Sequence, residues 1–240
     1  MPCRLFRDVP AYGAWNMAVD EATLESALLQ PAGGPTLRWY QWSTPTLSMG
    51  YFQSARDVPE SLTSLPRVRR LTGGGAILHD CELTYSLVFP AKSWPRDNFL
   101  DLVSDIHDEI RQALDGLAFV GKQPQEAMAE PFLCFERRSP LDLVRPEGKV
   151  VGSAQRKRSG ALLQHGSILL SASRSAPHLV GWNAEPCDEI IENIITQVSA
   201  GLSKRWSLEL AALPRSEEEL ALAKQLAEEK YGTATWNDRR

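Results

Sequence analysis

Hydrophobic residues recur at helical spacing between positions 99 and 117, where they lie three or four positions apart. Such spacing places them on one face of an α-helix. The apolar members are Phe99, Val103, Ile106, Ile110, Ala113 and Leu117. The intervening acidic residues are Asp101, Asp105, Asp108 and Glu109. The pattern predicts an amphipathic helix that packs one side on a core and turns its acidic side to water.

Three further segments are predicted to be helical. Residues 15–29 are good helix formers without glycine or proline, and residues 189–202 have a similar composition. The last helix is expected to begin at Ser216, because Glu219 follows at the spacing of a capping box. We interpret residues 1–240 as one domain in which 216–240 form a C-terminal helical appendage, after a short linker at 213–215.

Strand predictions rest on short runs of apolar, β-branched and aromatic residues. Residues 118–145 carry no such pattern and are expected to be an irregular loop, functional at this length. Strands grouped between helices predict an α+β fold, with helices packed against a mixed, largely antiparallel sheet. The predicted strands are 36–42, 47–52 and 83–89, and a hairpin is expected at 149–153 and 161–170.

Composition and charge exclude several classes of protein. With 43% hydrophobic and 23% charged residues, the chain has the composition of an ordinary globular domain. A net charge of −4 gives no reason to expect general binding to nucleic acid or membranes. No apolar run is long enough for a membrane span, and no secretory signal is recognisable. The four cysteines lack CxxC spacing, so we expect free thiols in the cytoplasm rather than a zinc site.

A run of three glycines, Gly73, Gly74 and Gly75, is the most informative local feature. Apolar residues on both sides predict a strand, a glycine turn and a second strand. Such a turn lets a ligand lie directly on the backbone, within reach of its N–H groups. The preceding Arg69 and Arg70 would suit an anion. A glycine-rich hairpin without any ligand is an equally good interpretation of this segment alone.

A second informative segment is strongly basic. Residues 137–158 contain seven basic residues and two acidic ones, in a chain that is acidic overall. The surplus indicates either a solvated face or a docking surface for an acidic partner or a phosphate-bearing substrate. Lys149 differs from its basic neighbours, because Gly152, Ser153 and Ala154 leave space beside it. A lysine there could donate to a carbonyl oxygen, or it could form a structural ion pair.

Taken in order, these segments make the chain similar to the superfamily of lipoate-protein ligases, octanoyltransferases and biotin-protein ligases. The matching stretches span most of the chain and occur in the family's order. They are Asn16-Met17-Ala18-Val19-Asp20-Glu21, Pro45 to Gln53, Arg69 to Asp80, Lys149 to Gln155, Gln164 to Leu170, and the C-terminal Lys230-Tyr231-Gly232 with Trp236-Asn237. The resemblance implies the biotin/lipoate-ligase-like catalytic domain.

Within the superfamily, the sequence resembles one octanoyltransferase branch that has a ligase-like sequence. Ligases typically carry a Gly-Asn pair soon after the His-Asp of the glycine segment, whereas this chain has Glu82-Leu83-Thr84-Tyr85-Ser86. That branch also places a Cys-Phe pair shortly before the lysine strand, and Cys134-Phe135 lies fifteen residues before Lys149. One departure is Gly75, which stands where the branch is expected to have arginine.

The resemblance implies an acyltransferase of lipoate biosynthesis. It would move an octanoyl or lipoyl group from acyl carrier protein to a lysine of a lipoyl-domain protein, such as glycine cleavage H protein or a 2-oxoacid dehydrogenase E2. No cofactor is expected for this reaction, and the chain is expected to be a monomer. The alternatives are an ATP- and magnesium-dependent lipoate-protein ligase that forms lipoyl-AMP, and a non-catalytic homologue that only binds lipoyl domains.

Cys134 and Lys149 are the implied catalytic residues. Basic flanks would favour the thiolate form of Cys134, and Lys149 would stabilise negative charge on the acyl oxygen. Cys187 occupies the nucleophile position of a different branch, but Glu185, Asp188 and Glu189 would disfavour a thiolate there.

Substrate binding is assigned by the same resemblance to residues of three segments. His79 and His165 could act as general bases, but we prefer an interpretation in which they brace the glycine segment and its neighbouring strand. The predicted substrate-binding residues are Arg70, Gly73, Gly74, Gly75, His79, Gly152, Ser153, Ala154, His165 and Gly166.

Overall fold

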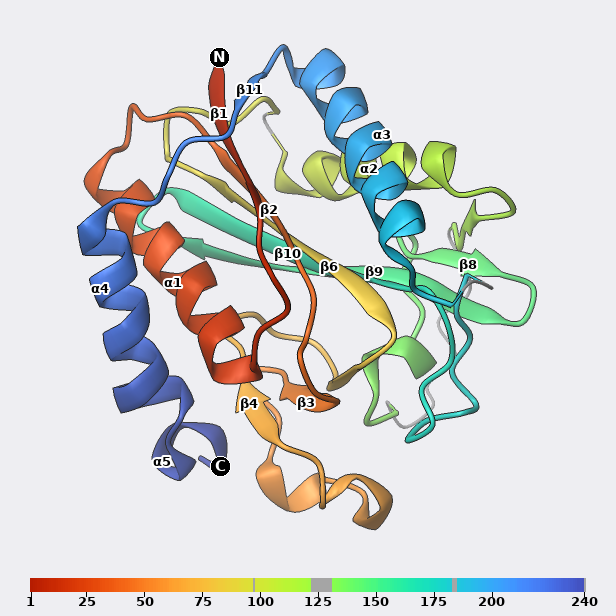
Figure 1. Ribbon diagram of the computed structural model, residues 1–240. Coiled ribbons are helices and arrows are strands. Elements are labelled where there is room, and N and C mark those ends of the chain that lie inside the picture. The colour runs from red at the N-terminus through yellow and green to blue at the C-terminus, as the bar shows by residue number, and fades with distance from the viewer. Residues whose placement is uncertain (97, 122–130, 183–184, 240) are drawn as a thin grey trace.

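A large twisted sheet organises the computed structural model, which describes residues 1–96, 98–121, 131–182 and 185–239 (Figure 1). Its strands lie in the order β11-β1-β2-β6-β10-β9-β8-β7. The three strands β11, β1 and β2 pair in parallel, and every other pairing in this sheet is antiparallel. The predicted α+β fold with a mixed, largely antiparallel sheet is therefore confirmed. The strands are β1 Pro2–Arg7, β2 Thr36–Tyr40, β6 Glu82–Phe89, β7 Ala118–Phe119, β8 Leu143–Arg145, β9 Gly148–Arg158, β10 Ala161–Leu169 and β11 Glu209–Ala211.

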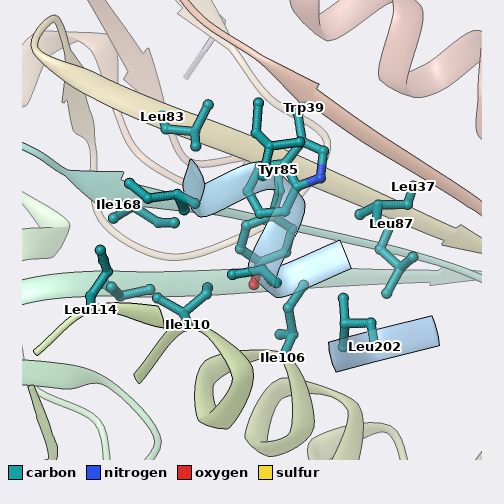
Figure 2. Close-up of a cluster of buried hydrophobic side chains, with 14 of the residues drawn as sticks. Leu37, Trp39, Leu83, Tyr85, Leu87, Ile106, Ile110, Leu114, Ile168 and Leu202 are labelled. Carbon is teal, nitrogen blue, oxygen red and sulfur yellow. The ribbon is translucent and has the colours of Figure 1, made fainter. Parts of the chain in front are cut away.

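Helices cover both faces of the sheet (Figure 1). Because side chains alternate along a strand, Leu37 and Trp39 of β2 face one side while Arg38 and Tyr40 face the other. The first side packs against α2 and α3, and Figure 2 shows Tyr85, Ile106 and Leu202 meeting there. The second side packs against α1, along which α4 lies. The helices are α1 Gly13–Leu29, α2 Phe99–Ala113, α3 Asp188–Trp206, α4 Glu217–Leu226 and α5 Ala234–Asn237, with a π-helical turn at Ala227–Tyr231.

Helix α2 forms as predicted but ends four residues early and is rotated from the expected orientation. Phe99 is exposed, whereas Leu102 is fully buried on the core side. Asp105, expected on the wet side, is instead buried against α3, where it accepts hydrogen bonds from Arg205 and the indole N–H of Trp206. A second helix packs over part of the face that was predicted to contact water, and this could not be inferred from the periodicity of α2 alone.

The glycine segment belongs to a separate small sheet, with the strand order β4-β3-β5. These strands are β3 Thr46–Met49, β4 Arg67–Arg69 and β5 Ile77–His79. The predicted succession of strand, glycine turn and strand is correct. The prediction of a hairpin is wrong, because β3 lies between the two strands and pairs with both. The glycine turn therefore crosses over the end of β3, which opens a wider loop than a hairpin turn would.

The hairpin of β9 and β10 is confirmed, and β9 is longer than predicted. The expected loop 118–145 is less irregular than its sequence suggests. It contributes the edge strand β7, its neighbour β8 and a 3-10 turn, η3 Cys134–Glu136. Residues 122–130 of that loop lie outside the described residues. Two short 3-10 turns, η1 Ala55–Asp57 and η2 Glu60–Leu62, follow β3.

The C-terminal segment packs on the first helix and on the small sheet. Ser216 caps α4 with the predicted capping box to Glu219. Glu21 of α1 accepts hydrogen bonds from Lys230 and from the hydroxyl of Tyr231. The buried guanidinium of Arg69 donates to the backbone carbonyl of Asn237 at 2.9 Å. The last residues thus fix the strand that leads into the glycine segment.

Candidate functional site

A cavity of about 1750 Å³ opens where the small sheet meets the large one. Its walls come from segments far apart in sequence, including the glycine turn, η3, β9 and β10. All of the residues that the sequence analysis singled out as catalytic or substrate-binding line this one cavity. Their common location does not by itself assign a role to any of them, because a role depends on the contacts of each side chain.

Cys134 lies at the start of η3, half-buried in the wall of the cavity. Its backbone N–H donates to the carbonyl of Ala76 at 2.7 Å, and the N–H of Ala76 donates to the carbonyl of Phe132 at 3.0 Å. These two bonds tie the segment before η3 to the residue that follows the glycine turn. The thiol is therefore placed by backbone contacts, which do not depend on which side chains surround it.

Lys149 is the cation nearest to that thiol. Its Nζ lies 3.7 Å from Cys134 Sγ and 3.4 Å from the Cys134 carbonyl oxygen. The same ammonium forms a 2.8 Å ion pair with Asp142 Oδ2, and both side chains are almost fully buried. The structural ion pair that the sequence allowed for Lys149 is present, and the same ammonium group also faces the thiol.

Gly152 makes room for this arrangement. A Cβ atom at Gly152 would lie 2.5 Å from Lys149 Cε and 2.7 Å from Lys149 Nζ. The lysine side chain thus folds over Gly152, three residues along the same strand. The expectation that small residues leave space beside the lysine holds at this position, and any larger side chain would displace the ammonium group.

The glycine turn is shaped from inside by Arg70. Its buried guanidinium donates to the carbonyls of Gly73 and Gly75, both at 2.7 Å, and to that of Ser48 at 2.8 Å. Gly74 has φ of +90°, a conformation that residues with a Cβ rarely adopt. Burial lowers the pKa of Arg70 to about 10. These donors hold the turn open, so they are not directed at an anion as the sequence suggested.

Gly75 borders the cysteine directly. A Cβ atom there would lie 2.8 Å from Arg137 Nε and 2.9 Å from the backbone nitrogen of Cys134. Arg137 Nε in turn donates to the carbonyl of Pro131 at 2.7 Å. The guanidinium of Arg137 therefore occupies space beside Gly75, in the region where the resembled branch was expected to carry an arginine at position 75.

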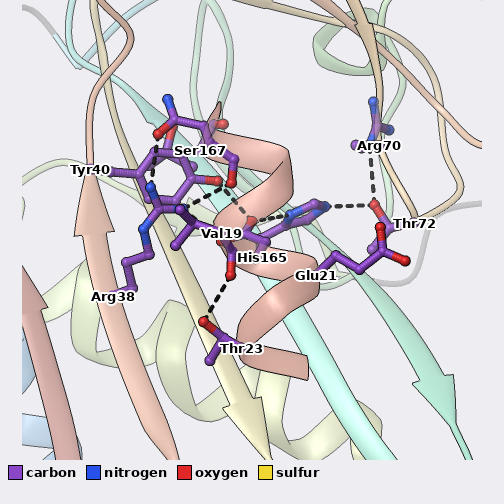
Figure 3. A network of polar contacts seen from close by, with 12 residues as sticks. Val19, Glu21, Thr23, Arg38, Tyr40, Arg70, Thr72, His165 and Ser167 are labelled. Atoms are coloured by element: carbon purple, nitrogen blue, oxygen red, sulfur yellow. Dashed lines mark hydrogen bonds and ion pairs between the residues drawn. The ribbon is translucent and has the colours of Figure 1, made fainter. Parts of the chain in front are cut away.

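His165 belongs to a buried polar network (Figure 3). Arg70 Nε can only donate and the Asp20 carboxylate can only accept, so for the neutral form of the His165 ring the direction of each bond follows. Arg70 donates to Thr72 Oγ1 at 3.1 Å, Thr72 donates to His165 Nε2 at 2.6 Å, and His165 Nδ1 donates to Asp20 at 3.2 Å. The Nε2 lone pair is thus already used, which fits a bracing role for His165 better than that of a general base.

Asp20 is in turn paired with Arg38 at 2.8 Å. Burial alone would raise the pKa of Asp20, but the hydrogen bond from His165 and the charge of Arg38 hold it below its usual value. Arg38 also donates to the side chain of Asn16 at 2.8 Å. This network joins α1 to β2 and β10 beneath the cavity.

His79 is also held by neighbours. Its ring stacks on Trp42, with centroids 3.8 Å apart and planes inclined by 9°. Its Nδ1 lies 2.5 Å from the Glu82 carboxylate, which also accepts from Thr84 and Ser167. Burial lowers the pKa of His79. The bracing interpretation preferred for His79 agrees with these contacts.

Sequence reasoning missed His107 and Asp142. His107 Nδ1 must donate to the carbonyl of Leu141 at 2.5 Å, so in the neutral ring Nε2 accepts from Ser153 Oγ, also at 2.5 Å. Ser153 then accepts from the hydroxyl of Tyr85. Burial lowers the pKa of His107 to about 4, which keeps the ring neutral. The sequence carried no signal for this, because the partners of His107 lie 34 and 46 positions away.

The other basic residues and cysteines lie elsewhere. Arg158 pairs with Glu25, and Arg145 contacts Glu147, so the basic surplus of 137–158 is not gathered on one surface. Cys187 is exposed at the start of α3 and does not line the cavity. Cys3 is buried, which raises the pKa of its thiol to about 11. Among the four thiols, Cys134 alone faces both the cavity and a cation.

Two kinds of feature are absent from the described ranges. No group of three or more His, Cys, Asp and Glu side chains in them converges as metal ligands would. None of their helices combines the length and hydropathy needed to cross a membrane.

Comparisons with known proteins show which family the chain resembles. The chain is 31% identical to octanoyltransferase LipM of Bacillus anthracis and 33% identical to that of Brevibacillus brevis. These matches cover 93% and 95% of both sequences, respectively. The fold resembles lipoate-protein ligase A bound with ATP, with a TM-score of 0.78 at 23% identity over 99% of both chains. It also resembles a bi-partite lipoate protein ligase from Thermoplasma acidophilum, with a TM-score of 0.74 at 24% identity over 100% of this chain and 98% of that one.

The family of the lipoyl protein ligase A/B catalytic domain matches residues 13–202, which include the small sheet, η3 and the β9–β10 hairpin. Together with the LipM relatives, this match settles the family. The chain belongs to the lipoyl protein ligase A/B catalytic domain family.

Proposed function

We propose that this protein transfers an octanoyl group, or a lipoyl group, from the thioester of acyl carrier protein to a lysine of a lipoyl-domain protein. The observation that carries the proposal is the Cys134–Lys149 pair in the cavity, with Sγ and Nζ 3.7 Å apart. Two relatives with 31% and 33% sequence identity are octanoyltransferases, matched over nearly their whole length, and the likeness to ligases is one of fold.

The chemistry needs a nucleophile rather than an activating nucleotide. The Cys134 thiolate attacks the thioester carbonyl, and the thiolate of the carrier leaves and takes up the proton released from Cys134. The acceptor lysine, as a free amine, then attacks the acyl-cysteine, loses a proton and regenerates the thiol. Lys149 stabilises the thiolate before the first step and the oxyanion during both steps. A free carboxylate would instead require ATP, because it has no leaving group.

The cavity suits a medium acyl chain. Its lining includes apolar surface from Met17, Ile77, Leu100 and Val103 next to the glycine turn. Burying about six methylenes contributes on the order of 5 kcal/mol, which is enough to select for chain length. The proposal includes no cofactor and a monomeric protein acting in the cytoplasm, with glycine cleavage H protein or a 2-oxoacid dehydrogenase E2 as acceptor.

The test is a transfer assay that compares reactions with and without nucleotide. Octanoyl-carrier protein and a lipoyl domain are mixed with the protein, with and without ATP and Mg²⁺, and the acceptor mass is followed. The proposal predicts an octanoyl adduct on the acceptor at the same rate in both mixtures. Modification only with free lipoate and ATP would establish the ligase instead. Complex formation without modification under any condition would establish a binding homologue.

A further inference from the structure

We propose that Asp142 is a positioning residue that holds the Lys149 ammonium group against Cys134. The inference rests on the proposed function, because it assigns a role within that mechanism. The sequence did not single out Asp142. Its carboxylate contacts Lys149, and Lys149 in turn contacts the thiol. Support for the inference comes from the geometry of the Asp142–Lys149 pair and the way the protein fixes each partner.

The first observation is that the ion pair is buried. Asp142 Oδ2 and Lys149 Nζ are 2.8 Å apart, with side-chain exposures of 7% and 3%. Burial raises the pKa of Asp142 even though Lys149 lies beside it. Placing an unpaired ammonium in such a site would be costly, so the carboxylate is what makes a charged lysine tolerable there. The position of the charge is therefore set by Asp142.

The second observation is that Asp142 is itself fixed from several sides. Its carboxylate accepts the backbone N–H of Ser139 at 2.6 Å, and its own N–H donates to the carbonyl of Ser139 at 2.9 Å. Its carbonyl accepts the N–H of Val120 at 3.0 Å. The preceding carbonyl, that of Leu141, accepts from His107. The turn 139–142 is thus anchored to β7 and α2, so the carboxylate cannot follow Lys149 if the lysine moves.

The third observation concerns the other charges that face the ammonium. His107 is kept neutral by burial, and the positive charge of Lys149 contributes to the lowering of its pKa. Arg70 and Arg137 are two further cations in the neighbourhood of Cys134. Asp142 is the carboxylate in contact with Lys149, and Cys134 supplies the remaining negative charge when its thiol ionises.

The consequence is specific for the thiol. Without the negative charge of Asp142, the buried Lys149 either loses its proton or turns toward water. In both cases Cys134 loses the adjacent positive charge, and a higher pH is required to form its thiolate. A role of Asp142 that was limited to folding would lower stability but would leave this pH dependence unchanged.

The experiment measures the alkylation of Cys134 by iodoacetamide as a function of pH, without any acyl substrate. The Cys134 peptide is quantified by mass spectrometry, so the other cysteines do not interfere. Asp142→Asn keeps the shape of the side chain and its contact with Ser139 but removes the charge. We expect the pH midpoint of alkylation to rise by about one unit, which lowers the rate by about tenfold at pH values below both midpoints. Asp57→Asn, on an exposed turn, is the matched control and should leave the midpoint unchanged.

Two further variants sharpen the outcome. In a Lys149→Met background, Asp142→Asn should add no further rise, because Asp142 acts on Cys134 through the ammonium group that Lys149→Met has already removed. Asp142→Glu keeps the charge, so its midpoint should lie closer to that of the wild type than to that of Asp142→Asn, even if Asp142→Asn folds poorly. An unchanged or lower midpoint in Asp142→Asn, or an equal rise in Asp142→Glu, would overturn the proposal. Since no transfer is measured, these results stand even if the proposed acyl transfer itself is disproved.

Discussion

The cavity has two walls that use buried charge differently. Behind one wall, Asp20, Arg38 and His165 are joined by a buried ion pair and hydrogen bonds, and Arg38 also bonds Asn16. On the other wall, Lys149 lies between the fixed carboxylate of Asp142 and the half-buried thiol of Cys134. Both walls carry buried ion pairs at the same distance of 2.8 Å.

The difference lies in the third group. In the network of Asp20, each group is bonded to other buried groups that hold it in place, so the network defines the shape of the wall. Beside Lys149, the third group is a thiol whose charge must change if it reacts. Ionisable groups whose charge state depends on a close charged neighbour are expected at a catalytic centre. The comparison therefore separates a scaffold wall around Asp20 from a reactive wall around Lys149.

The largest expected effect is on the scaffold wall. Asp20→Asn removes one of the two carboxylates that pair with the buried guanidinium of Arg38 and leaves the other, Asp8 at 2.6 Å. Removing one partner of a buried pair costs up to about 3–5 kcal/mol. Urea denaturation should show this loss, while transfer per folded molecule should change less than in variants of the reactive wall. A loss below about 1 kcal/mol would mean that the network does not hold the wall together.

The second effect is on the reactive wall and concerns turnover. Lys149→Ala should lower octanoyl transfer at least about 100-fold, the usual scale for a group that stabilises an oxyanion. Circular dichroism must show that the variant is folded, because Asp142 loses its partner. Transfer near the wild-type rate in a folded variant would remove Lys149 from the mechanism and erase the distinction between the two walls.

The third effect tests the support behind the reactive wall. The pKa of His107 is lowered to about 4 by burial, so the unfolded chain takes up a proton near pH 6.5 while the folded protein does not. Stability should therefore fall as the pH falls below about 6.5, by about 2 kcal/mol at pH 5.

His107→Gln should remove that part of the pH dependence, and His178→Gln, at an exposed histidine, should keep it. The measurement is the free energy of unfolding at pH 7 and pH 5 for the three proteins. Equal slopes for the wild type and His107→Gln would show that His107 is not buried in its neutral form.

The sequence predicted the parts of the fold whose pattern is local. The run of apolar, β-branched and aromatic residues in 83–89 indicated a strand, and the spacing in 99–117 indicated a helix, because both patterns depend on neighbours in the chain. The short strands β1 and β11 were not predicted, because their pairing partners lie far away in sequence. The glycine hairpin was wrong for the same reason, since β3 is inserted between β4 and β5 only by tertiary pairing.

The site was predictable to a similar extent. Cys134 and Lys149 could be named because their sequence neighbours resemble a family, and the fold brings them together. Asp142 and His107 could not, because an aspartate in a loop and a histidine on a helix are common. Their importance depends on burial and on contacts with Lys149, Leu141 and Ser153, which only the folded chain defines.

The central claim is that Cys134 carries the acyl group, and intact mass spectrometry tests it most directly. The wild-type protein, Cys134→Ser and Cys187→Ser are each incubated with octanoyl-carrier protein and then treated with hydroxylamine, which cleaves thioesters. We predict a hydroxylamine-sensitive octanoyl adduct on the wild type and on Cys187→Ser, and none on Cys134→Ser. An adduct that survives Cys134→Ser and disappears in Cys187→Ser would contradict the account, as would active transfer by a wild-type protein that never forms an adduct.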